Sequence, residues 1–182
     1  AVDGAEIIFV VLPAFAHAYV AQELAGCLVD GQTVVVCPGA TGGALEFRAI
    51  WDRAGCRSKV RLCETNSLFY AARAQDAVAT ISGVKDELSL AALPAQDTQA
   101  IIDDLSDVYP QLIPAANVLE TSLNNMNTVV HPLPVLLNAG SIERGEKFRH
   151  YFDGITPAVG EVVEQMDRER VAVGRAYGLD IL

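Results

Sequence analysis

The chain has 182 residues, of which 51% are hydrophobic, and its formal net charge is −10 at pH 7. Such an acidic chain repels phosphate backbones and anionic lipids, which excludes nucleic acid and membranes as its main partners. The longest apolar run, residues 7–16, is too short to cross a bilayer and contains a proline. The composition therefore predicts a large core, or apolar surface kept for partner domains or subunits.

Four cysteines, at positions 27, 37, 56 and 63, form no CxxC pair and have no histidine at the spacing of a zinc site. No metal site is expected from them. Reduced cysteines act as small hydrophobic residues and are typical of a reducing cytoplasm, which is the expected location.

Strands and helices alternate along the first third of the chain. Apolar strand patterns occupy residues 7–12, 33–37 and 59–63, with helical patterns at 14–28 and 44–54 between them. This alternation with short loops predicts a parallel α/β sheet with right-handed crossovers. A sheet rarely begins with its most buried strand, so further strands are expected before residue 7 in the whole protein.

The loops that follow these strands, 11–17, 37–43 and 63–73, should meet at one edge of the sheet, where such sheets bind ligands. In 37–43 the glycines allow close backbone approach, and the following helix N-terminus should offer free N–H groups to an anion. The same spacing also marks an ordinary tight loop.

Two charged or titratable side chains in these loops need separate interpretations. Arg73 is a lone cation among apolar neighbours, and its planar guanidinium could bind a substrate carboxylate bidentately. A plain salt bridge is the alternative interpretation for Arg73. His17 lies early in a predicted helix, and its expected role is structural.

The next elements complete the first domain. Residues 77–84 and 88–93 are predicted to form a hairpin at the sheet edge, joined by a turn at 85–87. A helix over 97–108 should carry its aspartates on a solvated face, and 112–113 should add a short strand. The boundary is expected at 114–117, which gives an α/β domain over 1–113 and a helical domain over 114–182.

The helical domain is expected to open with one helix that ends at His131, because Pro132 disfavours the α conformation at the preceding residue. One face of this helix would carry amides, hydroxyls and an imidazole, which suit a polar cleft better than bulk solvent. The members of this polar face are Glu120, Thr121, Asn124, Asn127, Thr128 and His131. A hydrogen-bonded core histidine with asparagine caps is the alternative. Further on, Thr156-Pro157 predicts the start of a long helix that runs to Tyr177.

Five segments together resemble the opine dehydrogenases, the octopine/nopaline dehydrogenase family, over nearly all of 1–182. They are PAFAH, PGATGGALEFR, ETNSLFYAAR, LETSLNNMNTVVHPLPVLLNAG and DGITPAVGEVVEQMDRERVAVGRAYGL. The resemblance implies the second half of a Rossmann-like doubly wound parallel sheet, followed by part of a helical domain like that of 6-phosphogluconate dehydrogenase. The sequence contains no Gly-x-Gly, so the family's N-terminal dinucleotide fingerprint is absent, and the C-terminal helices of the family are not expected in this chain.

The resemblance also implies a function and a set of site residues. Family members use NAD or NADP to condense an amino acid with a 2-oxo acid and to reduce the resulting imine. The motif's histidine, which is His131 here, would be the general acid/base. The other implied roles are orientation by Asn124 and Asn127, substrate binding by Arg73 and Thr128, and contact with the nicotinamide end of the cofactor by Pro13, Gly39, Glu64 and Thr65.

Two other functions stay open at this stage. One is another two-domain NAD(P)-dependent dehydrogenase that acts on a 2-oxo acid or hydroxy acid without an amino-acid partner. The other is a non-catalytic assembly module. The expected partners are small molecules, namely the amino acid and the 2-oxo acid, and a homodimer is left open.

Overall fold

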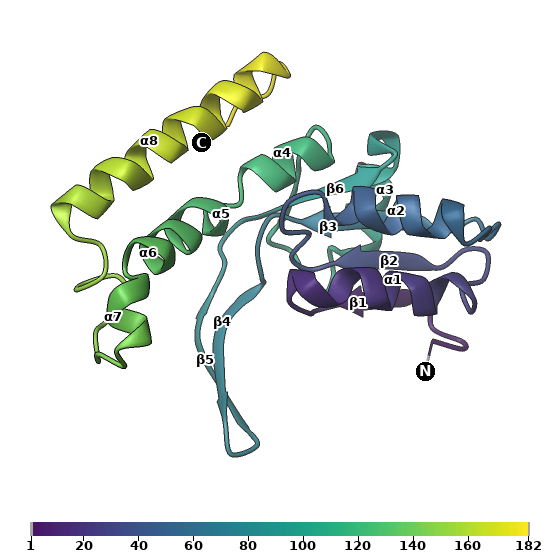
Figure 1. Ribbon diagram of the computed structural model, residues 1–182. Helices are drawn as coiled ribbons and strands as arrows, with labels where there is room; N and C mark the ends of the chain where they lie inside the picture. Colours follow the sequence, from purple (N-terminus) through teal and green to yellow (C-terminus); the bar gives the residue numbers. More distant parts are fainter. Residues whose placement is uncertain (1, 182) are drawn as a thin grey trace. The chain divides into compact units, whose positions relative to one another are not determined.

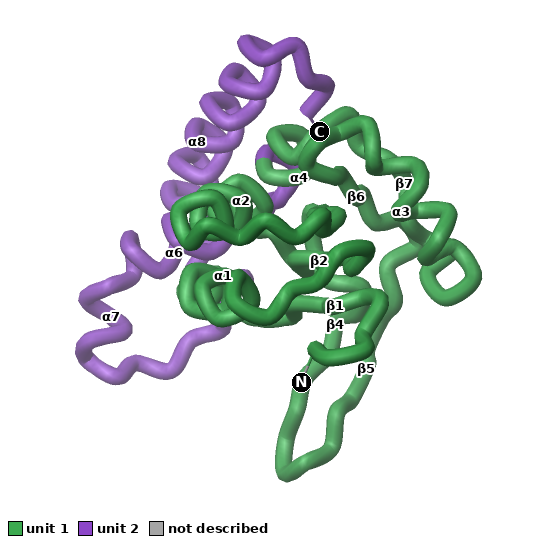
Figure 2. Tube along the Cα trace, turned by 90° about the vertical axis from the view of Figure 1, so that its right-hand side faces the viewer, with its two compact units in different colours: residues 1–122 green, residues 123–182 purple. Residues whose placement is uncertain are grey.

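A computed structural model describes residues 2–181 of the chain (Figure 1). The chain divides into two compact units, Ala1–Ser122 and Leu123–Leu182 (Figure 2). This division by compactness falls within helix α4 (Val118–Leu123), whereas the sequence predicts the start of the helical domain at residue 114. Each unit is described by itself.

The first unit is built on a five-stranded sheet in the order β1-β2-β3-β6-β7. The strands are β1 (Ile7–Val10), β2 (Thr33–Val36), β3 (Arg61–Thr65), β6 (Leu88–Leu93) and β7 (Leu112–Pro114). Neighbouring strands are parallel except for β3 and β6, which run antiparallel. The sheet is therefore mixed, although its first three strands have the parallel arrangement that the sequence predicts.

Helices cover both faces of this sheet. Successive side chains of β2 point to opposite faces and pack in two different hydrophobic clusters. Val34 and Val36 pack in the cluster that contains residues of α1 (His17–Ala25) and α2 (Gly43–Arg53). Val35 packs in the second cluster, with residues of α3 (Thr98–Leu105). Short 3-10 turns, η1 (Ala14–Ala16) and η2 (Ala95–Asp97), lead into α1 and α3. The predicted Rossmann-like, doubly wound class is confirmed.

The predicted edge hairpin between 77–84 and 88–93 is wrong. Strand β5 (Val78–Val84) pairs instead with β4 (Tyr70–Gln75) in a separate two-stranded sheet (Figure 1). Strand β6 lies inside the main sheet, between β3 and β7. Its near-continuous apolar sequence LSLAAL is typical of a strand that is buried on both faces, and such a strand lies inside a sheet and not at its edge.

The β4–β5 hairpin turns at Asp76 and Ala77, which both have positive φ angles of 48° and 64°. Two-residue turns with this backbone match the twist of the flanking strands. Asp tolerates the left-handed conformation better than most residues, but the Asp-Ala pair lacks the glycine that usually signals such a turn. Every residue of both strands is exposed. Because both strands are exposed on both faces, neither has, along its whole length, the alternation of apolar and polar residues that would predict the hairpin.

The second unit contains α5 (Asn127–Val130), α6 (Pro132–Leu137), α7 (Ala139–Glu143) and α8 (Pro157–Ala176). The predicted continuous helix that ends at His131 is wrong, because the helix is interrupted between α4 and α5. At the break, the Asn125 side chain accepts a hydrogen bond from the Asn127 N–H (3.1 Å), and the Asn125 carbonyl accepts one from the Thr128 hydroxyl (2.8 Å). Asn side chains compete in this way with the helical hydrogen bonds of the backbone.

The start of α8 confirms the sequence prediction. Thr156 adopts an extended backbone as N-cap, and its hydroxyl accepts a hydrogen bond from the Val159 N–H (3.4 Å), with Pro157 in the first turn. Val162 and Val173 of this helix remain exposed.

The four cysteines are free thiols, and Cys37 and Cys63 are buried. Burial raises the pKa of both buried thiols, which disfavours the reactive thiolate. Within residues 2–181 no group of His, Cys, Asp and Glu side chains could hold a metal ion. None of the helices described is long and apolar enough to cross a membrane.

Candidate active site

His131 lies between α5 and α6, where Pro132 begins a new helix. The sequence thus placed the imidazole correctly at a helix end, although the helix before it is short. The His131 Nε2 atom is 2.6 Å from the hydroxyl of Tyr151, which belongs to the irregular segment between α7 and α8. His131 is half-buried, and 57% of the Tyr151 surface is exposed, so the pair is accessible to solvent.

The tyrosine hydroxyl is a suitable partner for a histidine that exchanges protons. A hydroxyl group can donate one hydrogen bond and can also accept. It can therefore donate to Nε2 of a neutral imidazole and accept from Nε2–H of an imidazolium. The contact between Tyr151 and His131 is compatible with both protonation states.

A second histidine packs against this pair. The His150 ring lies 5.7 Å from the His131 ring and 4.7 Å from the Tyr151 ring, edge to face in both cases. Its Nε2 lies 3.1 Å from the carbonyl oxygen of Val130, which can only accept a hydrogen bond, so Nε2 carries the proton and donates. Sequence reasoning missed His150 and Tyr151, because their irregular segment has no periodicity that points to His131.

The other residues of the predicted polar helix face lie on different elements. Asn127 and Thr128 lie in α5, within one turn of His131, but Asn124 lies in the turn before α5. The Thr128 hydroxyl donates to the Asn125 carbonyl. Thr121 lies still earlier, in the buried part of α4. A single polar wall with all six residues is therefore not formed.

The residues predicted to contact a cofactor lie at the carboxyl ends of β1, β2 and β3, at one edge of the sheet. Pro13 follows β1 and is exposed. Gly39 follows β2 and is buried, and its N–H donates to the carbonyl of Thr65 (2.9 Å). Glu64 and Thr65 are the last residues of β3, and both side chains are buried. The four residues share an edge, but only Pro13 offers its side chain to solvent.

The free N–H groups expected at the start of α2 are already engaged. The Gly42 N–H donates to the Ser122 hydroxyl (2.9 Å), and the Ala44 N–H donates to the Glu64 carboxylate (2.7 Å). The Gly43 N–H donates to the carbonyl of Gly39 (2.9 Å). The expectation that this helix N-terminus is open to an anion is therefore wrong, because protein groups satisfy these three donors.

Two features at the same edge are better suited to a ligand with an apolar ring and an amide group than to a phosphate. Among the described residues, the Asn66 Oδ1 atom is buried and has no hydrogen-bond partner, so it could accept a hydrogen bond from a ligand amide. A cavity of about 330 Å³ lies at the same edge, lined by Phe9, Val11, Cys37 and residues 68–70 among others, but not by Asn66. Apolar cavities with a few polar groups are the usual form of small-molecule sites.

Arg73 lies in β4, in the exposed hairpin, and its guanidinium Nη1 donates to the carbonyl of Ala72 (2.9 Å). No acidic side chain pairs with Arg73 among the residues that the structure describes. The alternative of a plain salt bridge is therefore not observed. Exposure leaves the cation accessible to a substrate.

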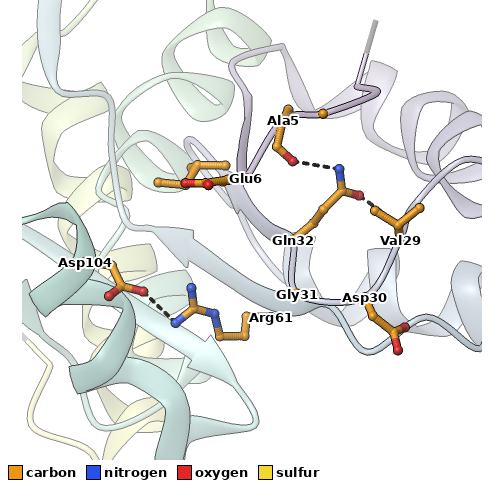
Figure 3. A pocket seen from close by; sticks show the side chains of 10 residues that line it. Ala5, Glu6, Val29, Asp30, Gly31, Gln32, Arg61 and Asp104 are labelled. Atoms are coloured by element: carbon orange, nitrogen blue, oxygen red, sulfur yellow. Dashed lines mark hydrogen bonds and ion pairs between the residues drawn. The ribbon is translucent and has the colours of Figure 1, made fainter.

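A larger cavity, of about 590 Å³, lies at the opposite edge of the sheet, where the strands begin (Figure 3). Several of its polar groups bind each other. The Gln32 amide donates to the Ala5 carbonyl (2.8 Å) and accepts from the Val29 N–H (2.9 Å), and Arg61 pairs with Asp104 (2.7 Å). Parallel sheets bind ligands at the carboxyl ends of their strands, so size alone does not make this cavity the site.

The sheet, with helices on both faces, defines an α/β protein with a Rossmann-like fold, and the second unit is helical. Comparison with known proteins makes the assignment more specific. Residues 114–182 match the family described as NAD/NADP octopine/nopaline dehydrogenase, alpha-helical domain. An opine dehydrogenase of Arthrobacter sp. (strain 1C) is 41% identical over all of this chain and 50% of its own length.

Solved structures give the same fold. Yersinopine dehydrogenase aligns with 97% of the chain and 45% of its own length, at 18% identity and a TM-score of 0.81. A ketopantoate reductase from Ralstonia eutropha JMP134 aligns with 98% of the chain and 54% of its own length, at 15% identity and a TM-score of 0.65. At these identities the likeness concerns the fold alone.

The chain is similar to the opine dehydrogenases over its whole length, as the sequence motifs predicted, and residues 114–182 match the helical-domain model of that family. It spans about half the length of the relatives that it matches.

Proposed function

We propose that this chain is part of an NAD(P)H-dependent opine dehydrogenase, which condenses an amino acid with a 2-oxo acid and reduces the imine. The observation that carries the proposal is the held imidazole of His131, 2.6 Å from the Tyr151 hydroxyl, within the segment that matches the family's helical domain. An imidazole nitrogen can both give and take a proton, as a general acid/base must.

The residues at the carboxyl edge of the sheet fit the nicotinamide end of the cofactor. Pro13 supplies exposed apolar surface, and the unpartnered Asn66 Oδ1 could accept from a carboxamide N–H. Gly39 and Thr65 would shape this edge through the backbone. NAD(P)H, when bound, supplies the hydride for the imine carbon. The phosphates have no free N–H donors at the start of α2 and would be held elsewhere.

His131 would move protons at the substrate. As an imidazolium, it gives its proton to the carbonyl oxygen of the 2-oxo acid while the amine nitrogen of the amino acid attacks the carbonyl carbon. His131 then takes the proton that the attacking nitrogen releases and gives it to the carbinolamine hydroxyl, which leaves as water while the nitrogen lone pair forms the C=N bond of the protonated imine. Tyr151 keeps a hydrogen bond to Nε2 in both states. Asn127 and Thr128, one turn away, would orient the substrate, and Asn124 would act from the preceding turn.

The amino-acid requirement tests the reaction class. The full-length enzyme should oxidise NAD(P)H with a 2-oxo acid only when an amino acid is also present, and the product should be a secondary amine dicarboxylate. Absorbance at the nicotinamide band and mass spectrometry of the product measure both. Equal rates without any amino acid across a panel of 2-oxo acids would replace the proposal with a simple 2-oxo-acid reductase, the fold of which is also similar.

Arg73 should bind the carboxylate of one substrate. In the full-length enzyme, Arg73→Lys keeps the charge but removes the bidentate geometry, which costs about 1.5–3 kcal/mol of binding to that carboxylate. The KM for one substrate should therefore rise by about 10- to 100-fold, while the KM for NAD(P)H stays unchanged.

Lys85→Arg provides a control for Arg73→Lys, because it exchanges the same two side chains at the end of the same hairpin. It should change neither KM. Unchanged KM values for both substrates in Arg73→Lys would remove Arg73 from the site.

A further inference from the structure

The Glu64 carboxylate is the most deeply buried acidic group described, with no exposed surface. Its Oε2 atom accepts from the Ala44 N–H (2.7 Å), and its Oε1 atom accepts from the hydroxyls of Thr121 (2.6 Å) and Ser122 (3.1 Å). Burying a carboxylate is costly unless hydrogen bonds replace its water. These three donors provide the replacement.

The donors come from two helices that are distant in sequence. Ala44 lies in the first turn of α2, whereas Thr121 and Ser122 lie in α4. The Ser122 hydroxyl also accepts from the Gly42 N–H (2.9 Å), which continues the network into the 37–43 loop. One carboxylate at the end of β3 thus connects α4, the start of α2 and the glycine-rich loop.

The loop also lies directly against the carboxylate. A Cβ atom added to Gly39 would overlap the Glu64 side chain, so only glycine lets the backbone approach this closely. The Gly39 N–H donates to the Thr65 carbonyl beside Glu64. The path of the 37–43 loop is therefore set by the Glu64 side chain on one side and by the β3 backbone on the other.

We infer that Glu64 is a positioning residue, an internal anion that fills the N-terminus of α2 and fixes the 37–43 loop against α4. The inference rests on the proposed function in one respect, namely that a cofactor binds beside this loop. A negative charge is stabilised at a helix N-terminus by the aligned peptide dipoles. Burial raises the pKa of Glu64, and the three hydrogen bonds oppose that shift.

The role assigned to Glu64 differs from cofactor contact. The carboxylate is covered and its acceptor positions are used, so it acts on a ligand through the loop that it holds. Its presence also excludes a cofactor phosphate from the start of α2, since the phosphate would need the same N–H groups. The family resemblance implied contact for Glu64, and the geometry points to indirect action.

The test uses Glu64→Gln in the full-length enzyme, with Glu46→Gln as the matched control on the exposed side of α2. The glutamine keeps the shape, but it has one acceptor oxygen instead of two and no charge. Calorimetric titration should show NAD(P)H binding weakened by about 10- to 100-fold, the effect of losing a hydrogen bond to a charged group. The kcat at saturating cofactor should stay within about threefold, and Glu46→Gln should behave as wild type.

Amide hydrogen exchange supplies a readout that does not depend on cofactor binding. The Gly42 and Ala44 amides should exchange faster in Glu64→Gln, since their protection depends on the network. Ser122→Ala, which keeps the Glu64 charge and removes the bridge to Gly42, should have the same effect on Gly42 alone. This second variant serves if Glu64→Gln does not fold.

The outcomes separate the two proposals. Unchanged exchange at Gly42 and Ala44, or a lower Tm with unchanged NAD(P)H affinity, would overturn the positioning role. A wild-type enzyme that binds no NAD(P)H would overturn the proposed function, and faster exchange in Glu64→Gln would still support the structural connection made by Glu64.

Discussion

Replacing His131 with asparagine should lower kcat by about 10²- to 10⁴-fold in the full-length enzyme, the usual contribution of a positioned general acid/base. The fold should persist, because His131 is only half-buried and its side chain is hydrogen-bonded to the exposed Tyr151. Affinity for NAD(P)H should also persist. The pH profile of the wild type should contain a limb that the variant lacks, because the variant has no side chain that can exchange a proton at this position.

Two further variants show whether the effect belongs to His131 itself. Tyr151→Phe removes the hydroxyl partner and should lower kcat by about tenfold, with a shifted pH limb. His150→Gln changes the neighbouring ring that bonds the Val130 carbonyl, and its effect on kcat should be smaller than that of His131→Asn. A near-normal kcat in His131→Asn, with a lowered Tm, would instead identify a structural histidine.

Removing the indole of Trp51 should cause the largest loss of stability in the first unit. Trp51 is only 1% exposed, packs edge to face on Phe47 (5.9 Å), and donates from Nε1 to the Ala21 carbonyl (3.0 Å). This bond joins α2 to α1. Truncation of a buried Trp to Ala costs about 3–5 kcal/mol, so Trp51→Ala should lower the urea midpoint strongly.

A phenylalanine at position 51 separates the two contributions of the indole. It keeps most of the apolar volume but leaves the Ala21 carbonyl without its donor, which costs about 1–3 kcal/mol. We expect Trp51→Phe to lie between wild type and Trp51→Ala. If the two variants lose equal stability, the hydrogen bond rather than the packing dominates at this position.

Local signals in the sequence were sufficient for much of the fold. The strand–helix alternation of the first three strands, the Thr156-Pro157 helix start and the placement of His131 at a helix end all follow from short-range preferences. The family motifs gave the assignment. These features have in common that one stretch of chain contains the whole pattern.

The features that the sequence did not predict depend on contacts between distant segments, or on side chains that compete with backbone hydrogen bonds. Partners of β6 lie far along the chain on both sides, and β4 has no burial pattern because it is exposed throughout. Asn125 breaks a helix by using its own amide, which periodicity does not record. Tyr151 meets His131 from a segment twenty residues later, a contact that only the fold creates.

The hydrogen bonds of the Gln32 side chain help to fix the register in which β2 pairs with its neighbouring strands. The strand reads Thr-Val-Val-Val and is buried on both faces, so a shift by one residue would exchange valine for valine in the middle. Apolar burial therefore discriminates weakly against register slippage there. Gln32, directly before the strand, bonds the Val2 and Ala5 carbonyls and the Val29 N–H. A slipped strand would leave these groups unpaired, so a polar residue at the end of β2 determines the alignment of its apolar centre.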